Sequence, residues 1–346
     1  MKQLPSLIRT GAWTGGHIQG IAIDKERKYI YCSFTTELVK LDMDGNLIGS
    51  VRGFTGHLGC LAYSEKDGRV YASLEYKNDM IGKSVLRSLG IQDEIKNAFY
   101  IAIFDGEKLN RPDMNAETDG LMTTVFLREP TEDYLDEWEE NGKTCKHRLG
   151  CSGIDGITFA PIENETRLLV AYGVYGDVER ADNDHQVILS YVPEDLKPYE
   201  TVLTAKNIHE SGPASCKERF FVHTGNTTFG VQNMEYDPFT GNIFLAVYPG
   251  KKPCFPNYKM FVIDGSKAPE EQVLEGLNGM KGQVLSLKKE GSSVCGSYFP
   301  YGSTGMIALG DGYFYFSEDR KENGAYSSEI HLYRYTGDAE KPFVRV

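Results

Sequence analysis

The stretch TGHLGCLAY at residues 55–63 decides the fold, because related versions of it recur along the chain. Each copy places a short turn, led by glycine or histidine, directly before an apolar run that is typical of a strand. Repeats of this kind indicate an architecture of similar units that pack side by side. Aligned on their apolar positions, the copies are residues 17–22 (HIQGIA), 57–62 (HLGCLA), 153–158 (GIDGIT), 230–235 (GVQNME) and 302–307 (GSTGMI).

Three further strand candidates follow each copy. The second is separated from the first by turn residues such as Asp67-Gly68 and Asp311-Gly312, which predict hairpins. The second candidates are residues 28–34, 69–76, 167–175, 242–248 and 313–318. The third are residues 37–42, 99–105, 185–192, 258–264 and 329–335. The fourth are residues 47–51, 123–127, 200–204, either 272–277 or 283–287, and 342–346.

Four antiparallel strands repeated five times predict an all-β fold, namely a five-bladed β-propeller with four-stranded antiparallel blades around a central channel. We expect one domain, residues 1–346, with blades at approximately residues 14–53, 54–128, 150–206, 226–288 and 300–346. Residues 6–13 are expected to pair with the last blade, which would close the ring and leave no open edge there.

Two insertions interrupt the repeat. Residues 80–98 carry apolar side chains at helical spacing, which predicts a helix. Residues 128–148 are acidic, with Tyr134, Leu135 and Trp138 interleaved. Either insertion could be a surface excursion or a lid over the mouth of the channel.

Composition limits the partners. The formal net charge of −12 argues against nucleic acid, which requires a concentrated basic face. The 7 cysteines have no regular spacing, which indicates free thiols in a reducing compartment. No apolar run is long enough to span a membrane, and the first residues do not resemble a signal peptide. We therefore expect a cytoplasmic protein, or a secreted one from which a signal peptide has been removed, that takes a small-molecule or oligosaccharide ligand.

Polar residues gather where the innermost strands begin. In a propeller, the loops that lead into these strands open on the same face as the loops that join the second and third strands. Equivalent positions facing the channel are Gln19, Gly59, Asp155, Gln232 and Thr304. His17 and His57 occupy the position two residues earlier, where the other copies have glycine. Two imidazoles on neighbouring blades can converge on one ligand.

The residue types leave three chemistries open: proton transfer, metal binding and paired carboxylates. The predicted catalytic residues are His17, His57, Asp155, Tyr172, Tyr175 and Glu235. The predicted substrate-binding residues are Gln19, Glu75, Lys77, Asn78, Arg180, Gln232, Asn233, Tyr248, Lys251, Thr304 and Arg320. His17, His57 and Asp155 are also the candidate ligands of a divalent metal (calcium, manganese or zinc) in the channel. The basic pairs Lys251-Lys252 and Arg320-Lys321 on this face favour an anionic ligand.

Over its whole length the pattern resembles the five-bladed β-propeller superfamily. This superfamily includes arabinanase-like glycosidases, calcium-dependent nucleotidases and glutaminyl cyclases. The chain departs from two of these groups. Gln19 stands where an arabinanase-like enzyme would carry an acidic residue, and the Glu-Ser-Thr-Gly motif of glutaminyl cyclases is missing.

The function that these observations favour is that of a carbohydrate-active enzyme, a hydrolase or lyase. It would act on a polar, anionic saccharide through His, Tyr and carboxylate acid–base chemistry, with or without a metal. The alternatives are a calcium-dependent phosphohydrolase and a propeller that binds a ligand or a protein without catalysis.

Overall fold

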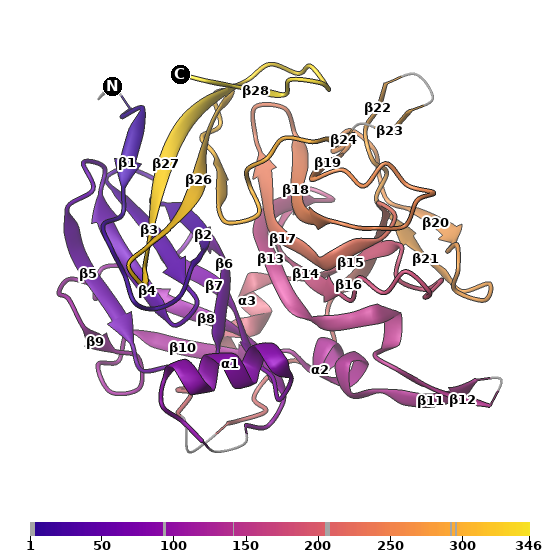
Figure 1. Cartoon of the computed structure of the whole chain (residues 1–346), viewed down its shortest axis with the longest axis horizontal. Helices are drawn as coiled ribbons and strands as arrows, with labels where there is room; N and C mark the ends of the chain where they lie inside the picture. The colour runs from indigo at the N-terminus through magenta and orange to yellow at the C-terminus, as the bar shows by residue number, and fades with distance from the viewer. Residues whose placement is uncertain (1–3, 93–94, 141, 205–207, 291–292, 295) are drawn as a thin grey trace.

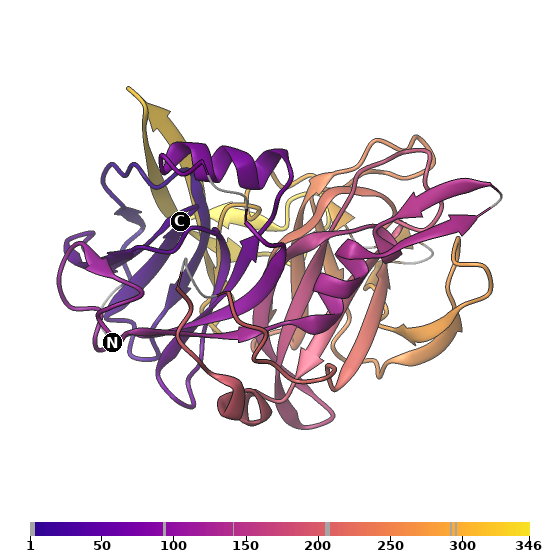
Figure 2. The ribbon, with the colours of Figure 1, turned by 90° about the horizontal axis from the view of Figure 1, so that it is seen from below.

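Five antiparallel sheets form a ring in the computed structural model, which confirms the predicted five-bladed β-propeller (Figure 1). The structure describes residues 4–92, 95–140, 142–204, 208–290, 293–294 and 296–346. The strands of each blade run between two faces of the ring. In Figure 2 helix α1 (Met80–Ser88) lies on one of these faces, and helix α3 (Pro193–Leu196) lies on the opposite one.

The first two blades match the predicted strand pattern closely. Their innermost strands are almost wholly buried, as expected for segments with few polar residues. Blade one consists, from the channel outward, of β2 (Ile18–Ile23), β3 (Tyr29–Phe34), β4 (Glu37–Asp42), β5 (Leu47–Arg52) and β9 (Met114–Asn115). Blade two consists of β6 (His57–Tyr63), β7 (Arg69–Tyr76), β8 (Ala98–Asp105) and β10 (Met122–Phe126).

Blade three differs from the prediction in its outer strands. Residues 200–204 were expected as its fourth strand, but Thr201 instead makes an isolated bridge to Thr124 of blade two. The fourth strand comes from later in the chain, after the segment that carries α3 and the 3-10 turn η2 (Lys197–Tyr199). The blade consists of β13 (Cys151–Ile162), β14 (Glu165–Val174), β15 (His185–Tyr191), β16 (Glu218–His223), β21 (Lys281–Val284) and β20 (Glu270–Val273).

Blade four also has an unexpected edge. The two segments predicted for its fourth strand, residues 272–277 and 283–287, overlap strands β20 and β21. Both of these strands belong to the sheet of blade three. The end of the second segment stays beside blade four, through the bridge between Ile263 and Leu287 and a hydrogen bond of 2.9 Å from the Asp264 amide to the Ser286 carbonyl. The blade consists of β17 (Thr227–Asp237), β18 (Asn242–Pro249), β19 (Met260–Ile263) and β24 (Gly296–Ser297). Strands β22 (Lys289–Glu290) and β23 (Ser293–Val294) form a separate hairpin.

Blade five closes the ring as predicted. The N-terminal strand β1 (Leu7–Arg9) pairs with β27, and Trp13 bridges Tyr326. The predicted strand at 342–346 is also present and pairs with the same strand. The blade consists of β25 (Met306–Ala308), β26 (Tyr313–Glu322), β27 (Ala325–Tyr335), β1 and β28 (Phe343–Arg345).

Apolar side chains fill the spaces between neighbouring blades. Five clusters of buried residues lie, in turn, at the five blade interfaces, as illustrated by Tyr71 and Leu168 between blades two and three. The interface between blades four and five is largely aromatic, with the rings of Phe244 and Phe314 5.1 Å apart. Burial of these surfaces is the main favourable contribution to folding. The core is therefore distributed around the channel.

The insertions keep the predicted helical and acidic character. Helix α1 begins at an Asp79 cap whose carboxylate accepts a hydrogen bond from the Gly82 amide at 2.8 Å. The second insertion forms α2 (Arg128–Leu135), the hairpin β11 (Glu137–Glu140) and β12 (Lys143–Lys146), and the 3-10 turn η1 (Arg148–Gly150). Whether either insertion acts as a lid stays a prediction.

Two further sequence expectations concern compartment. Six cysteines in the described ranges are free thiols, and Cys295 lies outside those ranges. None of the helices in the described part of the chain has the length and apolar composition that a membrane crossing requires.

Candidate functional site

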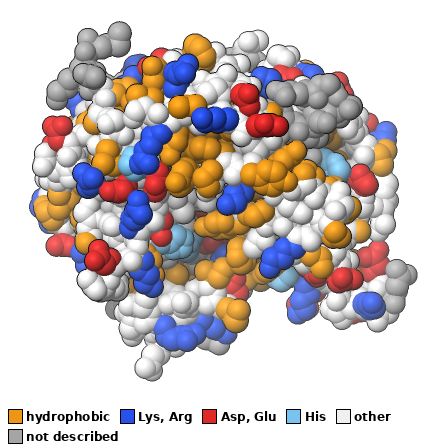
Figure 3. Space-filling view, turned by 45° about the horizontal axis from the view of Figure 1, so that its top comes forward, with side chains coloured by type: hydrophobic (Ala, Val, Ile, Leu, Met, Phe, Trp, Pro, Cys, Tyr) orange, Lys and Arg blue, Asp and Glu red, His pale blue; other side chains and the backbone are white. Residues whose placement is uncertain are grey.

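Four titratable side chains converge where the innermost strands begin. We call His57, Glu75, Lys77 and Asp155 the axial cluster, and this end of the channel the histidine mouth. Lys77 Nζ lies 2.7 Å from Glu75 Oε2, and Nδ1 of His57 lies 3.8 Å from the same oxygen. In Figure 3 a hollow is visible near the middle of the view, with histidine and acidic side chains among hydrophobic ones.

Two glycines make room for the carboxyl groups of the cluster. A Cβ atom on Gly153 would lie 1.9 Å from Glu75 Oε1, which accepts a hydrogen bond from the Ile154 amide at 2.7 Å. The φ of Gly153 is +132°, a conformation that other residues rarely adopt. A Cβ atom on Gly59 would lie 2.5 Å from Asp155 Oδ1. The glycines of the repeat therefore shape the site, and do not only end strands.

Burial controls the charges of the cluster. It raises the pKa of Asp155 well above its usual range, and the charge of Glu75 adds to this effect. It also lowers the pKa of His57 to about 3, with further lowering by Lys77 and His17. Burial therefore favours the protonated, uncharged form of Asp155, and His57 is a neutral imidazole near pH 7. Nδ1 of His57 is buried and has no hydrogen-bond partner within the described residues.

Glu75 and Lys77 form the charged part of the cluster. Burial raises the pKa of Glu75, and the nearby Lys77 opposes that rise. Burial disfavours the charged amine of Lys77, but the negative charges of Glu75 and Asp79 outweigh it and raise the pKa of Lys77. Lys77 also donates to the Ser152 carbonyl at 3.2 Å. The pair is thus a fixed ionic contact beside two neutral groups.

The predicted partnership of His17 with His57 is only electrostatic in the structure. The lowering of the His57 pKa by His17 shows that the imidazoles are close enough to repel each other when charged. His17 itself contacts Gln19, whose amide nitrogen lies 3.0 Å from His17 Nε2. Gln19 also donates to Thr35 at 3.2 Å. Its side chain is thus held within blade one, and His17 lies at the border of the axial cluster.

Asn233 has a structural role that differs from the predicted substrate contact. Its Nδ2 donates to the carbonyls of Gln19 at 2.8 Å and Ser303 at 3.1 Å, and its Oδ1 lies 3.3 Å from Cys60 Sγ. One buried side chain of blade four therefore reaches blades one, two and five. These bonds span the channel below the axial cluster.

Two other predicted contacts at the ring are satisfied internally. The Gln232 amide donates to the Phe229 carbonyl at 2.9 Å. The Thr304 hydroxyl lies 3.0 Å from Ser317 Oγ. Both side chains serve to hold strands of their own blade, which is the usual outcome for buried polar groups.

The predicted tyrosines do not share one location. Tyr172 is fully buried, and its hydroxyl donates to Asp133 of α2 at 2.6 Å, so it is a core residue and not a proton donor in the channel. Tyr175 lies closer to the axial cluster, as the influence of Lys77 on its pKa indicates. Its hydroxyl is hydrogen-bonded to Tyr134. Tyr134 comes from the acidic insertion and was not among the predicted site residues. The aromatic residues noted in that insertion were the available signal.

Tyr248 and Asn78 stay at the edge of the site. Burial raises the pKa of Tyr248 to about 12, and the charge of Asp155 contributes, which puts this phenol near the axial cluster. The backbone N–H of Asn78 donates a hydrogen bond to the side-chain oxygen of Asn97 at 2.7 Å. The side-chain oxygen of Asn78 is buried without a hydrogen-bond partner in the described ranges.

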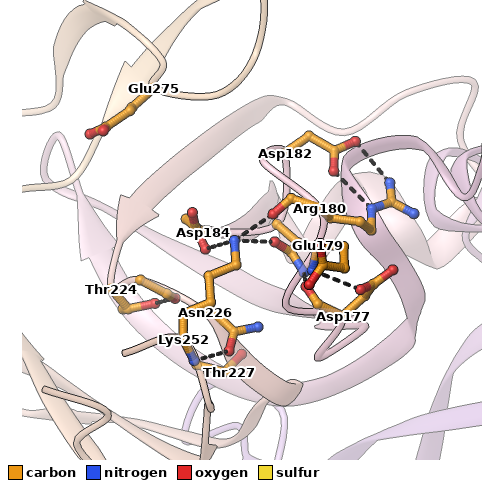
Figure 4. Close-up of polar contacts among 12 residues, drawn as sticks. Asp177, Glu179, Arg180, Asp182, Asp184, Thr224, Asn226, Thr227, Lys252 and Glu275 are labelled. Carbon is orange, nitrogen blue, oxygen red and sulfur yellow. Dashed lines mark hydrogen bonds and ion pairs between the residues drawn. The ribbon is translucent and has the colours of Figure 1, made fainter. Parts of the chain in front are cut away.

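Basic residues of the rim make contacts within the protein. Buried Lys252 donates to the Arg180 carbonyl at 2.5 Å, to Asn183 at 2.9 Å and to Asp184 at 2.6 Å (Figure 4). Arg180 itself pairs with Asp182 at 2.8 Å. These bonds join the loop after β14 to the loop after β18. Neither cation is left for an anionic ligand.

The remaining rim cations give the same result. Arg320 pairs with Glu329 of the adjacent strand at 2.9 Å. Lys321 lies over the ring of Tyr326, 4.7 Å from its centroid. Lys251 is exposed, and only its backbone amide is bound, to Asn226 at 2.8 Å. These contacts weaken the expectation, drawn from the sequence, that the basic residues bind an anionic ligand.

Glu235, one of the predicted catalytic residues, lies at the opposite end of the channel from Asp155. Glu235 follows the ring position by three residues, which corresponds to about 10 Å along a strand. It lines a cavity of about 770 Å³ together with Thr158 and Ala308, near the residues where the innermost strands end. We call this end the glutamate mouth.

Phe229 is a candidate contact that the sequence did not single out. It has a φ of +63°, an uncommon value for a residue with a side chain, and 40% of its surface is exposed. Its carbonyl lies beside Gly173, close to Ser152. An exposed aromatic ring in a strained conformation at a channel mouth is typical of a functional contact. Its position directly before the fourth copy of the repeat was the only sequence signal.

The predicted metal ligands do not form a recognisable site. Among the described residues, no group of three or more His, Cys, Asp or Glu side chains is arranged so that it could hold a metal ion. This includes His17, His57 and Asp155.

Comparisons with known proteins identify no family. No protein-family model matches the sequence, and no curated protein matches it. Similar solved structures include the apo soluble aldose sugar dehydrogenase of Escherichia coli, with a TM-score of 0.38, 10% identity, and coverage of 94% of this chain and 98% of that chain. They also include XC5397 of Xanthomonas campestris, a gluconolactonase, with a TM-score of 0.37, 9% identity, and coverage of 91% and 72%.

A third similar structure is the Cps50 (Swd1) β-propeller domain of Myceliophteria thermophila. It has a TM-score of 0.34 and 7% identity, and the alignment covers 95% of this chain and 100% of that chain. Similarities at this level give no information about activity. The function of the chain must be argued from its own site.

Proposed function

We propose that the histidine mouth is the active site of an enzyme that cleaves a polar, carbohydrate-like molecule by acid–base chemistry, as a hydrolase or a lyase. The axial cluster is the observation that carries this proposal. Desolvated titratable groups at the mouth of a channel are typical of catalytic sites, because pKa values there are shifted to suit proton transfer. A purely structural channel would not need a neutral acid, a neutral base and an ion pair in one place.

Asp155 and His57 receive the two catalytic roles. The raised pKa of Asp155 favours its protonated form, which can donate a proton to the leaving-group oxygen. His57 is uncharged and can accept a proton through a ring nitrogen. In hydrolysis the proton that His57 accepts comes from water, and in elimination it comes from a carbon next to an electron-withdrawing group. Both reactions use the same two groups.

Glu75 and Lys77 are positioning residues in this scheme. Glu75 is held by the Ile154 amide and by Lys77, so its negative charge has a fixed location. This charge helps to keep Asp155 protonated and would stabilise a positive charge that develops on His57 during the reaction. Phe229 supplies an exposed aromatic face on which a sugar ring could stack.

The charges of the site favour a neutral or weakly charged substrate over a strongly anionic one. Lys77 is balanced by Glu75, and Arg180, Lys252 and Arg320 are balanced by partners in the described residues. The polar hydroxyl groups of a saccharide need donors and acceptors more than they need net charge. We therefore place neutral glycosides ahead of uronic-acid oligosaccharides, which the sequence had favoured.

The proposal is tested by assaying the purified chain against a panel of neutral nitrophenyl glycosides and uronic-acid oligosaccharides. Nitrophenol release reports hydrolysis, and ultraviolet absorbance of an unsaturated product reports elimination. For a substrate that turns over, Asp155→Asn and His57→Gln should each lower kcat by about 10²–10⁴-fold. Asp44→Asn, in an exposed hairpin turn, is the matched control and should leave kcat unchanged.

Two results would contradict the proposal. One is turnover that survives both Asp155→Asn and His57→Gln. The other is the absence of turnover for the whole panel together with saturable binding of a panel member at the histidine mouth, which would identify a binding propeller without catalysis.

A further inference from the structure

A large cavity lies far from the axial cluster. It has a volume of about 770 Å³ and lies where the innermost strands end. Its rim includes residues of α3, which Figure 2 shows on the face opposite α1. Sites for drug-sized ligands commonly have volumes of about 300–1,000 Å³. The cavity therefore has the size of a ligand site, although the opposite mouth carries the catalytic candidates.

Asn233 separates this cavity from the axial cluster. Its bonds to the carbonyls of Gln19 and Ser303 and its contact with Cys60 join four of the five blades across the channel. Glu235 lies two residues further along the same strand and borders the cavity. A molecule at the glutamate mouth thus has its own floor and does not share contacts with a substrate at the histidine mouth.

Glu235 is the polar group of that floor. Burial raises its pKa to about 8, although the Ala308 amide, which donates to Oε1 at 3.0 Å, and the Thr158 hydroxyl partly oppose the rise. Near neutral pH the carboxyl group therefore carries a proton. A protonated carboxyl group is a hydrogen-bond donor as well as an acceptor.

The wall of the cavity is aromatic. Tyr63, Phe159 and Tyr236 stand at equivalent positions of three innermost strands, one residue after Ala62, Thr158 and Glu235, and all six residues line the cavity. Ile307, Leu309 and three prolines add apolar surface around them. A planar apolar molecule would bury its surface against this wall, at a gain of about 25 cal/mol per Å².

The charges at the rim are balanced. Lys25 lies 3.5 Å from Glu65, and Arg27 lies 3.3 Å from Asp311. Lys66 is paired with Glu194, and Lys197 also influences the pKa of Glu194. The rim therefore favours neither cations nor anions strongly. Selection must come from the aromatic side chains of the wall and from Glu235.

We propose that the glutamate mouth is a second ligand site, which takes an uncharged molecule with an aromatic body and one hydrogen-bond acceptor directed at Glu235. The residues that carry it are Glu235 on the floor and Tyr63, Phe159 and Tyr236 on the wall. The site is independent of the proposed catalytic function, because its residues and its opening differ from those of the axial cluster.

Benzamide and benzoate are suitable probes, because they have the same ring but differ in charge. Their binding to the full-length protein is measured by ligand-observed saturation-transfer NMR, at pH values well below and well above the Glu235 pKa of about 8. Benzamide should bind below this pKa and should weaken by about tenfold per pH unit above it, because Glu235 loses its proton. Benzoate should bind more weakly than benzamide throughout.

Three variants distinguish binding at Glu235 from binding elsewhere on the protein. Glu235→Gln retains a donor that does not titrate, so benzamide should bind it at both pH values. Ala308→Trp fills the cavity and should abolish binding, and its thermal midpoint shows whether the variant is folded. If Ala308→Trp does not fold, the pH response of Glu235→Gln decides alone. His57→Gln, at the other mouth, should leave benzamide binding unchanged.

Three results would overturn the proposal. The first is the absence of a saturable benzamide signal below the Glu235 pKa. The second is equal binding of benzamide and benzoate. The third is a benzamide affinity that still depends on pH in Glu235→Gln.

Discussion

The two mouths of the channel are built from the same five strands but have opposite properties. The histidine mouth is polar, with a buried ion pair beside the uncharged His57 and beside Asp155, whose raised pKa favours the uncharged form. The glutamate mouth is wide and aromatic, and one protonated carboxyl group forms its floor. Three residues along a strand separate Asp155 from Thr158, which is the position equivalent to Glu235.

This contrast teaches how burial without partners differs from burial with partners. At Glu75, Lys77 and the Ile154 amide oppose the effect of desolvation and so favour the charged form. Glu235 has no cation within ion-pair distance among the described residues, and it becomes neutral instead. One type of side chain therefore serves as a fixed charge at one mouth and as a proton-bearing donor at the other.

The largest effect is expected from breaking the ion pair. Lys77→Met should destabilise the protein by about 3–5 kcal/mol, because it leaves Glu75 buried without a counter-charge. Urea unfolding monitored by fluorescence measures the change. The double variant Lys77→Met with Glu75→Gln should recover a large part of the loss. A single variant as stable as the native chain would show that Glu75 is not held as a buried charge.

Gly153→Ala should have the next largest effect, about 2–3 kcal/mol, because it combines an unfavourable φ with a Cβ atom in the place of Glu75 Oε1. Gly241→Ala is the matched control. It also has a positive φ, of +73°, but a Cβ atom there meets no other atom within 4 Å. A loss for Gly153→Ala that is no larger than the loss for Gly241→Ala would argue against the contact with Glu75.

The pH dependence of stability should differ between the mouths. Unfolded Glu235 would lose its proton near its ordinary pKa, whereas the folded protein keeps it up to about 8, so stability falls as pH rises through this window. His57 has a pKa of about 3 in the folded protein and about 6.5 in the unfolded chain. Its contribution to stability is therefore lost as pH falls from about 6.5 to about 3.

Thermal midpoints across the pH range measure both limbs. Glu235→Gln should flatten the alkaline limb only, and His57→Gln the acidic limb only, each by a few degrees. A variant that flattens the wrong limb, or neither, would show that the assigned group does not titrate as the structure predicts.

The smallest effect on stability is expected for Phe229→Asn. Asn adopts a positive φ more easily than Phe, so stability should change by less than about 1 kcal/mol. The loss of an aromatic face should raise KM for a saccharide substrate by about fivefold, since such contacts contribute about 1 kcal/mol. Phe239→Asn, at another exposed phenylalanine, is the control for loss of exposed aromatic surface and should leave KM unchanged.

Much of the fold could be predicted from the sequence, because the repeat is local information. The copies at residues 17–22 and 57–62 already contain the alternation of turn and apolar run that defines a blade. The closure by β1 could also be predicted, since a propeller leaves one edge to be covered. The edges of blades three and four could not. Strands β20 and β24 are short and consist mainly of polar or small residues. Such segments do not specify the strand with which they pair.

The candidate site was only partly predictable, for a similar reason. Glu75, Lys77 and Asp155 were correctly expected on one face, since each lies next to a strand end that the repeat defines. Arg180, Lys252 and Arg320 were on the expected face as well, but their charges are taken by partners that only the loop conformations reveal. Tyr134 enters the site from an insertion with no repeat to locate it.

By itself, the sequence determined the five-fold repeat, the ring position of Asp155 and the two histidines that replace glycine, because each is a matter of order along the chain. Only the tertiary structure decided which of these groups are charged, which are bound, and which mouth each one faces. Those properties depend on distances between blades and on exclusion of water. For this reason the stretch at residues 55–63 marks a blade in the sequence, and in the structure it also supplies His57 to one mouth and the wall residue Tyr63 to the other.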